Sequence, residues 1–315
     1  MQNSLTNLQV VLKSRPLGVP QAEHFELVRS PIGEPSSGQV LIQVAFVSVD
    51  PAMRGWVNAA ANYAQPVAIG AVMKSFAVGR VVKSRHPKWH EGDLVTGLFG
   101  WQEWALVDAE VIDRKLDPDM LGNLPLSAAL GVLGLNGVTA YFGLLEIGQP
   151  RPGQTVVISS GAGAVGSCVG QIAKIAGCRT VGIAGGPAKV ALMREQFGFD
   201  VALDYKSPNF VDELRRACPE GVHVYFDNTA GSISDAVTSQ LATRGRVVIC
   251  GTVAHTEWSP PPIGPRIERQ LLVTRSRMEG FIAPDYQHRW EEAYKCLSKW
   301  LLDGRIKVVE EVLEG

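Results

Sequence analysis

The sequence lacks a long apolar run, a cluster of basic residues and the features of a signal peptide. No apolar stretch reaches the roughly 18 residues that a membrane-spanning helix needs. The N-terminal segment has neither a basic start nor a long apolar run, so we expect no secretory signal. The net charge of −1 and the lack of Lys/Arg runs give no reason to expect a nucleic acid or an anionic membrane as a partner. We therefore expect a cytoplasmic protein that acts on a small molecule.

Metal-ligand spacings are also missing. The chain has five cysteines, an odd number, at irregular spacings, and no two of them form a CxxC pair. This pattern disfavours both a disulfide framework and a cysteine-rich zinc site. The six histidines are scattered. His86 and His90 are four residues apart, but Pro87 and Gly92 predict a turn there and not a helix. The sequence therefore predicts reduced thiols and no metal site.

The first third of the chain has the pattern of a β-rich domain. Short alternating runs cover 39–50, 76–85 and 93–108, and each is bounded by Gly or Pro. Little helical periodicity occurs before residue 125. We expect residues 1–130 to form a compact, mainly antiparallel β domain.

The pattern changes to alternating strands and helices after about residue 125. A continuous apolar run at 155–160 is typical of a buried parallel strand, and four helix–strand repeats follow. A strand is predicted at 271–282, and an amphipathic helix at 285–304. We expect residues 131–304 to form a doubly wound parallel sheet, and 305–315 to be a strand that returns to the first domain. The fold class is α/β.

A glycine pattern follows the first of these parallel strands. Gly161, Gly163 and Gly166 form G-x-G-x-x-G between a predicted strand and a predicted helix. The motif alone is weak, but in this context it indicates a loop that binds the pyrophosphate of a dinucleotide at a helix N-terminus. The alternative is a Gly-rich turn without a ligand.

The acid that usually holds the adenosine ribose is absent from its place. That acid is expected roughly 20 residues after the glycine loop, where this chain has Ala-Gly-Gly-Pro at 184–187. The first acid beyond the second strand is Glu195, inside the next predicted helix. Without a carboxylate, nothing at this position repels a 2′-phosphate, and Gly185 and Gly186 leave room for one.

Cations stand near the same position. Lys189 follows the two glycines, and Tyr205 with Lys206 follows the third strand. These side chains can bind a phosphate, so the sequence predicts NADPH over NADH as the cofactor. The alternative is that Lys189 is an ordinary solvated helix residue.

Several stretches together resemble one family. They include "LGVLGLNGVTAYFGLLEIGQPRPGQTVVISSGAGAVGSCVGQIAKIAGC", "VSVDPAMRGW", "FGFDVALDYK", "VYFDNTAGS", "RVVICGTV" and "RMEGFI". They resemble the zinc-independent medium-chain dehydrogenase/reductases that reduce enones, such as prostaglandin reductases, alkenal double-bond reductases and curcumin reductases. The resemblance covers nearly the whole chain in order. It implies a GroES-like β-rich catalytic domain, a Rossmann domain that binds NADPH, and an active site in the cleft between them.

The resemblance also implies site residues. The family's cofactor-binding positions correspond to Thr139, Gly163, Ala164, Val165, Gly166, Gly186, Lys189, Tyr205, Asn228, Cys250, Gly251, Thr252, Phe281 and Ile282. Among these, Lys189 and Tyr205 match the residues that hold the 2′-phosphate, and Thr139 matches the threonine under the nicotinamide. For Asn228 a polar cap at a strand end is an equally common role.

The implied reaction is the reduction of an activated C=C bond. The Cys and His ligands of the zinc-dependent relatives are not found here, and without a Lewis acid alcohol oxidation is disfavoured. Hydride would add to the β-carbon of an enone, and the resulting enolate would need a hydrogen-bond donor and a proton. Two family tyrosines are replaced, one by Ala52 and one by Thr256. Thr256, the retained Tyr63 and a solvent water remain open as the donor.

Three points stay open at this level. A quinone reductase, and an NADPH-binding protein that has lost catalysis, are the alternative functions. The strand at 271–282 could pair across a two-fold axis, so we expect a homodimer. Relatives continue beyond the segment that matches "EEVLEG", so we expect that further segment to be missing from this sequence.

Overall fold

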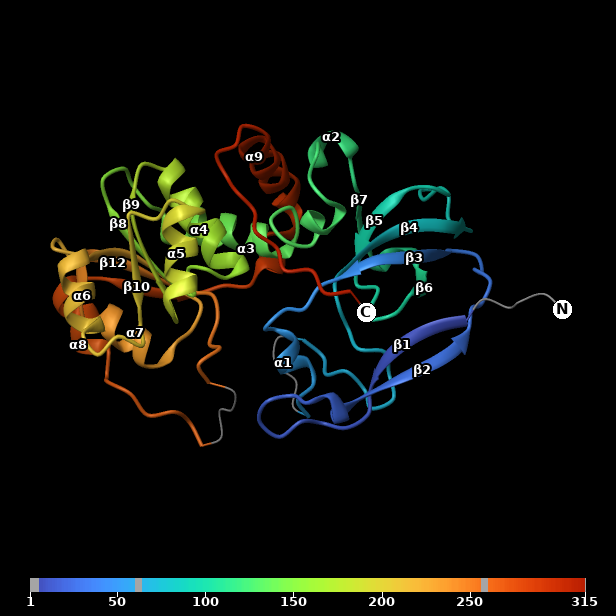
Figure 1. Ribbon diagram of the computed structural model, residues 1–315, viewed down its shortest axis with the longest axis horizontal. Helices are drawn as coiled ribbons and strands as arrows, with labels where there is room; N and C mark the ends of the chain where they lie inside the picture. The colour runs from blue at the N-terminus through green and yellow to red at the C-terminus, as the bar shows by residue number, and fades with distance from the viewer. Residues whose placement is uncertain (1–5, 60–63, 256–259, 315) are drawn as a thin grey trace. The chain divides into compact units, whose positions relative to one another are not determined.

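The computed structural model describes residues 6–59, 64–255 and 260–314. The chain divides into two compact units, Met1–Leu130 and Gly131–Gly315. The first is drawn in blue to green and the second in green to red (Figure 1). All residues predicted to bind the cofactor belong to the second unit.

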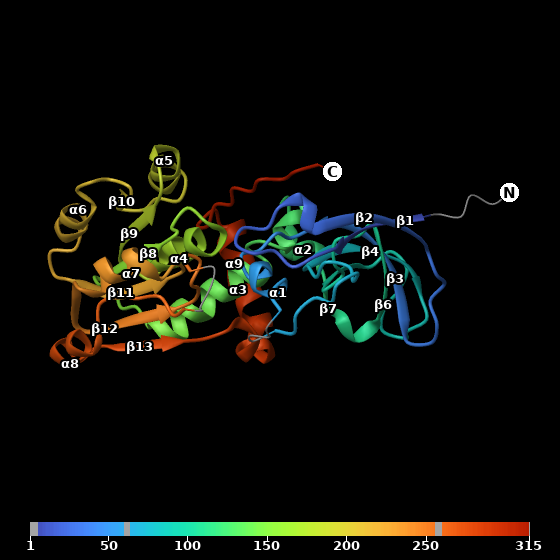
Figure 2. The same cartoon turned by 90° about the horizontal axis from the view of Figure 1, so that it is seen from below.

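The N-terminal unit is built from antiparallel strands. One sheet has five strands in the order β6-β3-β4-β5-β7, and β1 pairs with β2 along its whole length in a separate two-stranded sheet, as both views show (Figures 1 and 2). The strands are β1 (Thr6–Leu12), β2 (Phe25–Pro31), β3 (Gln39–Val47), β4 (Ala77–Ser84), β5 (Leu94–Gly97), β6 (Trp104–Asp108) and β7 (Ile112–Lys115). The short helices are η1 (Ala22–His24), α1 (Met53–Trp56), η2 (Ala109–Val111), α2 (Pro118–Leu121) and η3 (Leu126–Ala129). The predicted β-rich region is therefore confirmed.

The C-terminal unit is built around one parallel sheet. Its six strands lie in the order β10-β9-β8-β11-β12-β13, and every neighbouring pair is parallel. The strands are β8 (Thr155–Ser159), β9 (Arg179–Ala184), β10 (Val201–Asp204), β11 (Val222–Asp227), β12 (Leu241–Ile249) and β13 (Arg277–Gly280). The helices are α3 (Leu135–Phe142), the π-helix η4 (Gly143–Gly148), α4 (Ala164–Ile175), α5 (Pro187–Glu195), α6 (Phe210–Ala217), α7 (Gly231–Thr238), α8 (Glu268–Thr274), η5 (Ala283–Arg289) and α9 (Trp290–Leu302).

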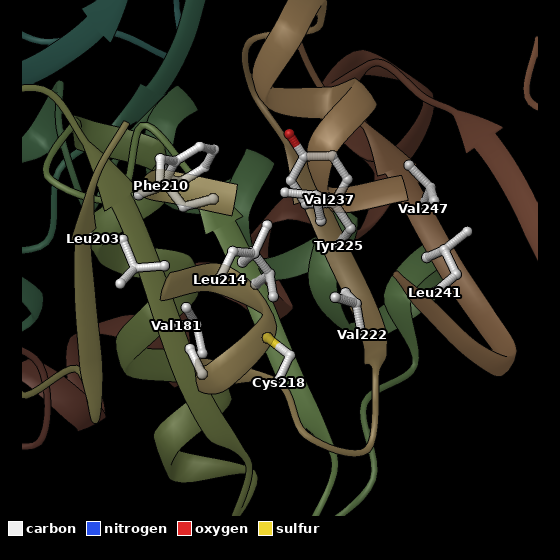
Figure 3. Close-up of a cluster of buried hydrophobic side chains, with 13 residues drawn as sticks. Val181, Leu203, Phe210, Leu214, Cys218, Val222, Tyr225, Val237, Leu241 and Val247 are labelled. Atoms are coloured by element: carbon white, nitrogen blue, oxygen red, sulfur yellow. The ribbon is translucent and has the colours of Figure 1, made fainter. Parts of the chain in front are cut away.

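The core of this unit explains the apolar runs in the sequence. Strands buried on both faces read as continuous apolar segments, and all five residues of β8 are buried. Figure 3 shows one side of the sheet, where Val181 of β9, Tyr225 of β11 and Val247 of β12 face helices α6 and α7. The α/β class and the doubly wound sheet are thus confirmed.

Two predicted strands near the C-terminus differ from the structure. Residues 268–274 form helix α8, and only 277–280 of the predicted strand at 271–282 are extended. Residues 305–314, expected to be a strand, form none. Instead Lys307 exchanges two hydrogen bonds with the side chain of Gln171 on α4, at 2.7 and 3.0 Å. The return of this segment to the first domain stays a prediction.

Candidate functional site

The predicted cofactor residues other than Thr139, which lies on α3, gather at one edge of the parallel sheet. Gly163 follows β8, Gly186 follows β9, Tyr205 follows β10, Asn228 follows β11, and the remaining loops follow β12 and β13. Because all six strands are parallel, their carboxyl ends lie along the same edge. The strand order reverses between β8 and β11, and open α/β sheets bind ligands at such a switch point.

The glycine loop after β8 is closely packed. A Cβ built on Gly166 would lie 2.2 Å from the main-chain oxygen of Ser160, and one on Gly161 would lie 2.6 Å from Sδ of Met193. Gly163 is the N-cap of α4, whose first turn carries no acidic residue. The free N–H groups of a first helical turn attract an anion. The loop therefore fits the pyrophosphate of a dinucleotide.

The loop after β9 forms the adenosine end of the candidate site. Gly186, the N-cap of α5, has φ +90°, a conformation that disfavours residues other than glycine. The first turn of α5 contains no acidic residue, and it carries the exposed Lys189. This end of the site is thus cationic and open to solvent, which suits a 2′-phosphate.

The loop after β10 packs directly on that turn. The main-chain N–H of Tyr205 donates to the oxygen of Ala184 at 3.1 Å. A Cβ on Gly185 would lie 2.8 Å from Cε1 of Tyr205, so any larger residue at 185 would clash with the Tyr205 ring. Tyr205 is 43% exposed. Nζ of Lys206 lies 6.0 Å from the centre of the Tyr205 ring. The two loops therefore present Lys189, Tyr205 and Lys206 at neighbouring strand ends.

Asn228 is fixed by the end of β8. Its main-chain N–H donates to Oγ of Ser159 at 2.8 Å, and its Nδ2 donates to the Ser159 oxygen at 2.7 Å. These bonds tie β11 to β8 at the switch point, so the residue does act as a polar cap. One N–H of the side-chain amide is engaged in this way, and the amide oxygen can accept from a ligand.

Sequence reasoning missed Asp227, which holds this region together. Its Oδ1 accepts from the hydroxyl of Tyr225 and from the main-chain N–H groups of Thr229 and Ala230, each at 2.9 Å. Asp227 is 1% exposed, and among the described residues its Oδ2 has no hydrogen-bond partner. Burial raises the pKa of Tyr225 well above its usual value, so this phenol stays protonated and donates. An acid at the end of a predicted parallel strand was the signal available in the sequence.

The loop after β12 is bonded to the same strand end. The N–H groups of Cys250 and Gly251 both donate to the main-chain oxygen of Asp227, at 2.8 and 3.1 Å. A Cβ on Gly251 would lie 2.9 Å from the oxygen of Asn228. Thr252 continues this loop, and its oxygen accepts from His255 at 2.9 Å. The loops after β11 and β12 therefore form one rigid group.

The Cys250 thiol lies within this group. Burial, with a smaller contribution from Asp227, raises the pKa of the thiol to about 12. The thiol is therefore neutral at physiological pH, and it contributes packing and not a nucleophile.

Helix α3 and the loop after β13 are also packed together. Oγ1 of Thr139 donates to the oxygen of Leu135 at 2.7 Å, so its hydroxyl oxygen is left to accept. A Cβ on Gly143 would lie 2.4 Å from Cζ of Phe281, and the Phe281 and Phe226 rings meet edge to face at 6.5 Å. Ile282 follows and is 37% exposed. The structure thus brings Phe281 against the turn that follows Thr139.

The two candidate proton donors, Tyr63 and Thr256, lie outside the described residues. Ala52 is the N-cap of α1 and packs on the cluster that contains Met53 and Trp56. No group of three or more His, Cys, Asp or Glu that could hold a metal ion is found among the described residues.

Comparison with known proteins gives a single answer. Two family models match the chain. The model described as the N-terminal domain of oxidoreductase matches residues 8–114, and the model described as zinc-binding dehydrogenase matches residues 164–299. The NADPH-dependent curcumin reductase of Escherichia coli (strain K12) is 41% identical over 100% of this chain and 91% of its own length. This chain belongs to the NADPH-dependent enone reductases of the medium-chain dehydrogenase/reductase family. Prostaglandin reductase 1 of Rattus norvegicus is 40% identical over 96% of this chain and 90% of its own length.

The structural comparison agrees with this family. CurA of Vibrio vulnificus, solved in complex with NADPH, has 40% identity and a TM-score of 0.90, with 98% of this chain and 92% of CurA covered. The predicted family is therefore confirmed.

Proposed function

We propose that this enone reductase uses NADPH to reduce the C=C bond of α,β-unsaturated ketones and aldehydes. One observation supports the proposal above all: relatives named as curcumin and prostaglandin reductases match over at least nine-tenths of both chains. The candidate site agrees, because a glycine loop and a cationic adenosine end lie on one sheet edge.

Each part of that edge has a task in binding NADPH. The loop at 163–166 holds the pyrophosphate with main-chain N–H groups, and Lys189 and Tyr205 hold the 2′-phosphate. Asn228 accepts from the nicotinamide half. Thr139, Phe281 and the loop at 250–252 border the ring and fix its orientation. When bound, NADPH supplies the hydride that adds to the β-carbon of the substrate.

The protein must also stabilise the enolate that the substrate becomes and let a proton reach its α-carbon. Thr256 and Tyr63 are the proposed hydrogen-bond donors, and a solvent water is the third candidate. The aliphatic hydroxyl of Thr256 is far less acidic than a phenol. We therefore expect Tyr63→Phe to lower kcat more than Thr256→Val if the proton comes from the protein.

A direct test follows the hydride. NADPH deuterated at C4 of the nicotinamide is mixed with 2-octenal or a chalcone, and the product is analysed by mass spectrometry. We expect a saturated carbonyl product with deuterium on the β-carbon. NADPH oxidation with quinones alone would support a quinone reductase instead. Tight NADPH binding without turnover of either substrate class would support a protein that has lost catalysis.

We further propose a homodimer that acts in the cytoplasm. Strand β13 lies at the edge of its sheet, and all four of its residues are exposed. Leu272, Val273 and Met278 add exposed apolar surface beside this edge, which is typical of a paired interface. All five cysteines carry free thiols, as a reducing compartment favours. Separately, among the described residues no helix is long and apolar enough to cross a membrane. Light scattering gives the mass, and a monomer would contradict the dimer.

A further inference from the structure

The carboxylate of Asp204 lies at the adenosine end of the candidate site, although no acid follows the second parallel strand, where the dinucleotide-binding motif usually has one. Oδ1 of Asp204, the last residue of β10, accepts from the main-chain N–H of Lys206 at 2.9 Å. The N–H groups of Lys206 and Gly186 hold the pKa of Asp204 below its usual value, so this carboxyl is ionised. Gly186 belongs to the other loop, where it caps α5.

Asp204 therefore lies at the point where two phosphate-facing loops meet. The loop after β9 carries Gly186 and Lys189, and the loop after β10 carries Tyr205. The hydrogen bond between Tyr205 and Ala184 joins the same loops, and Gly185 leaves the space that the Tyr205 ring fills. The ribose acid of other dinucleotide-binding folds follows the second strand, whereas this acid ends the third.

We propose that Asp204 is a specificity-determining residue for the dinucleotide. Asp204 is paired with Ala184 in the register of β10 and β9, which places it beside the loop that carries Gly186, and its negative charge limits the affinity for the 2′-phosphate. The inference depends on the proposed binding of that phosphate by Lys189 and Tyr205.

The two effects can be separated by substitution. Asp204→Asn keeps an accepting oxygen and removes the charge, so it relieves repulsion of a dianionic phosphate. At low salt we expect NADPH to bind about two- to fivefold more tightly, since charges in contact with water interact weakly and are screened by salt. NADH has no 2′-phosphate, so its affinity stays the same. Asp204→Ala removes the accepting oxygen as well, and we expect weaker binding of both dinucleotides.

Isothermal titration calorimetry of the full chain tests this without turnover. The ligands are NADPH, NADH, 2′,5′-ADP and 5′-AMP, each at low and at high salt. Glu195→Gln is the matched control, because it removes one exposed charge at the other end of α5. We expect Asp204→Asn to tighten NADPH and 2′,5′-ADP only, with a smaller gain at high salt, and Glu195→Gln to change nothing.

One further variant separates this inference from the proposed function. Lys189→Gln should weaken NADPH and leave NADH unchanged. If it does not, the assignment of the 2′-phosphate site is wrong, and the Asp204 inference is overturned with it. If Lys189→Gln behaves as expected while Asp204→Asn fails to tighten NADPH, or tightens NADH equally, only the role of Asp204 is refuted.

Discussion

The two ends of the proposed cofactor site hold their residues by different physical means. At the adenosine end, Lys189 is exposed and Tyr205 is 43% exposed. At the nicotinamide end, Asp227 is 1% exposed and binds three main-chain or phenolic donors at 2.9 Å. In the proposed site, one end selects its ligand with solvated charges, and the other fixes geometry with buried hydrogen bonds.

This difference has consequences for substitution. Solvated charges interact weakly and independently of the fold, so a change at the adenosine end alters affinity and little else. A buried carboxylate satisfies several donors at once, and its removal leaves them unpaired. We infer that cofactor preference can be changed without loss of stability, whereas changes near Asp227 affect the whole unit.

The largest effect is expected from Asp227→Ala. The substitution leaves the Tyr225 hydroxyl and the N–H groups of Thr229 and Ala230 without their acceptor. Burial of several unpaired donors should lower the free energy of unfolding by about 3–5 kcal/mol. Urea denaturation monitored by circular dichroism measures the loss.

Two variants serve as controls for this result. Asp227→Asn retains an accepting oxygen, so it should regain much of the lost stability. Asp204→Ala also removes a strand-end acid, but one that is only half-buried, and should cost little stability. Equal losses for Asp227→Ala and Asp204→Ala would contradict the contrast between the two ends.

The second effect is a change of cofactor preference. Lys189→Glu replaces a proposed phosphate-binding cation with an anion at the N-terminus of α5. Loss of a charge-assisted bond should raise the KM for NADPH about 30- to 100-fold, and the KM for NADH should change far less. Steady-state kinetics with both cofactors measures the ratio. An equal rise for both would contradict the proposed 2′-phosphate site.

The sequence alone predicts those features of the fold and of the candidate site that depend on local motifs and on hydrophobic periodicity. The glycine loop, the alternation of strands with helices and the helical position of Lys189 depend on local sequence. In the structure the loop follows β8, helices alternate with the parallel strands, and Lys189 lies on α5. The segment "LLVT" at 271–274 was expected to be a strand because apolar β-branched runs suit both states. It is helical, and Arg275, with φ +54°, ends that helix.

The roles of Asp204 and Asp227 could not be predicted in the same way. An acid at a strand end has the same local signature whether it faces water or binds main-chain N–H groups. In the sheet, Asp204 is paired with Ala184, which precedes the loop after a different strand. Only the folded chain brings these groups together.

The third expected effect concerns the glycine loop after β8, which is proposed to hold the pyrophosphate that joins the two halves of the cofactor. A Cβ at position 166 would lie 2.2 Å from the oxygen of Ser160, so Gly166→Ala must displace the pyrophosphate loop. We expect NADPH and NADH to bind about tenfold more weakly, with their ratio unchanged. Calorimetry measures both, and Ser167→Ala, which adds no volume in the same helical turn, is the control. A shift in the ratio would mean that the loop contributes to selectivity.

The smallest effect is expected from Tyr205→Phe. The ring still fills the space beside Gly185, so the loop should keep its shape and only the hydroxyl is lost. An exposed hydrogen bond to a phosphate contributes about 1 kcal/mol, so NADPH should bind about fivefold more weakly and NADH with unchanged affinity. Tyr205→Ala, which also empties that space, is the comparison in the same titrations. If the two variants weaken NADH alike, Tyr205 acts on the adenosine end through packing and not through its hydroxyl.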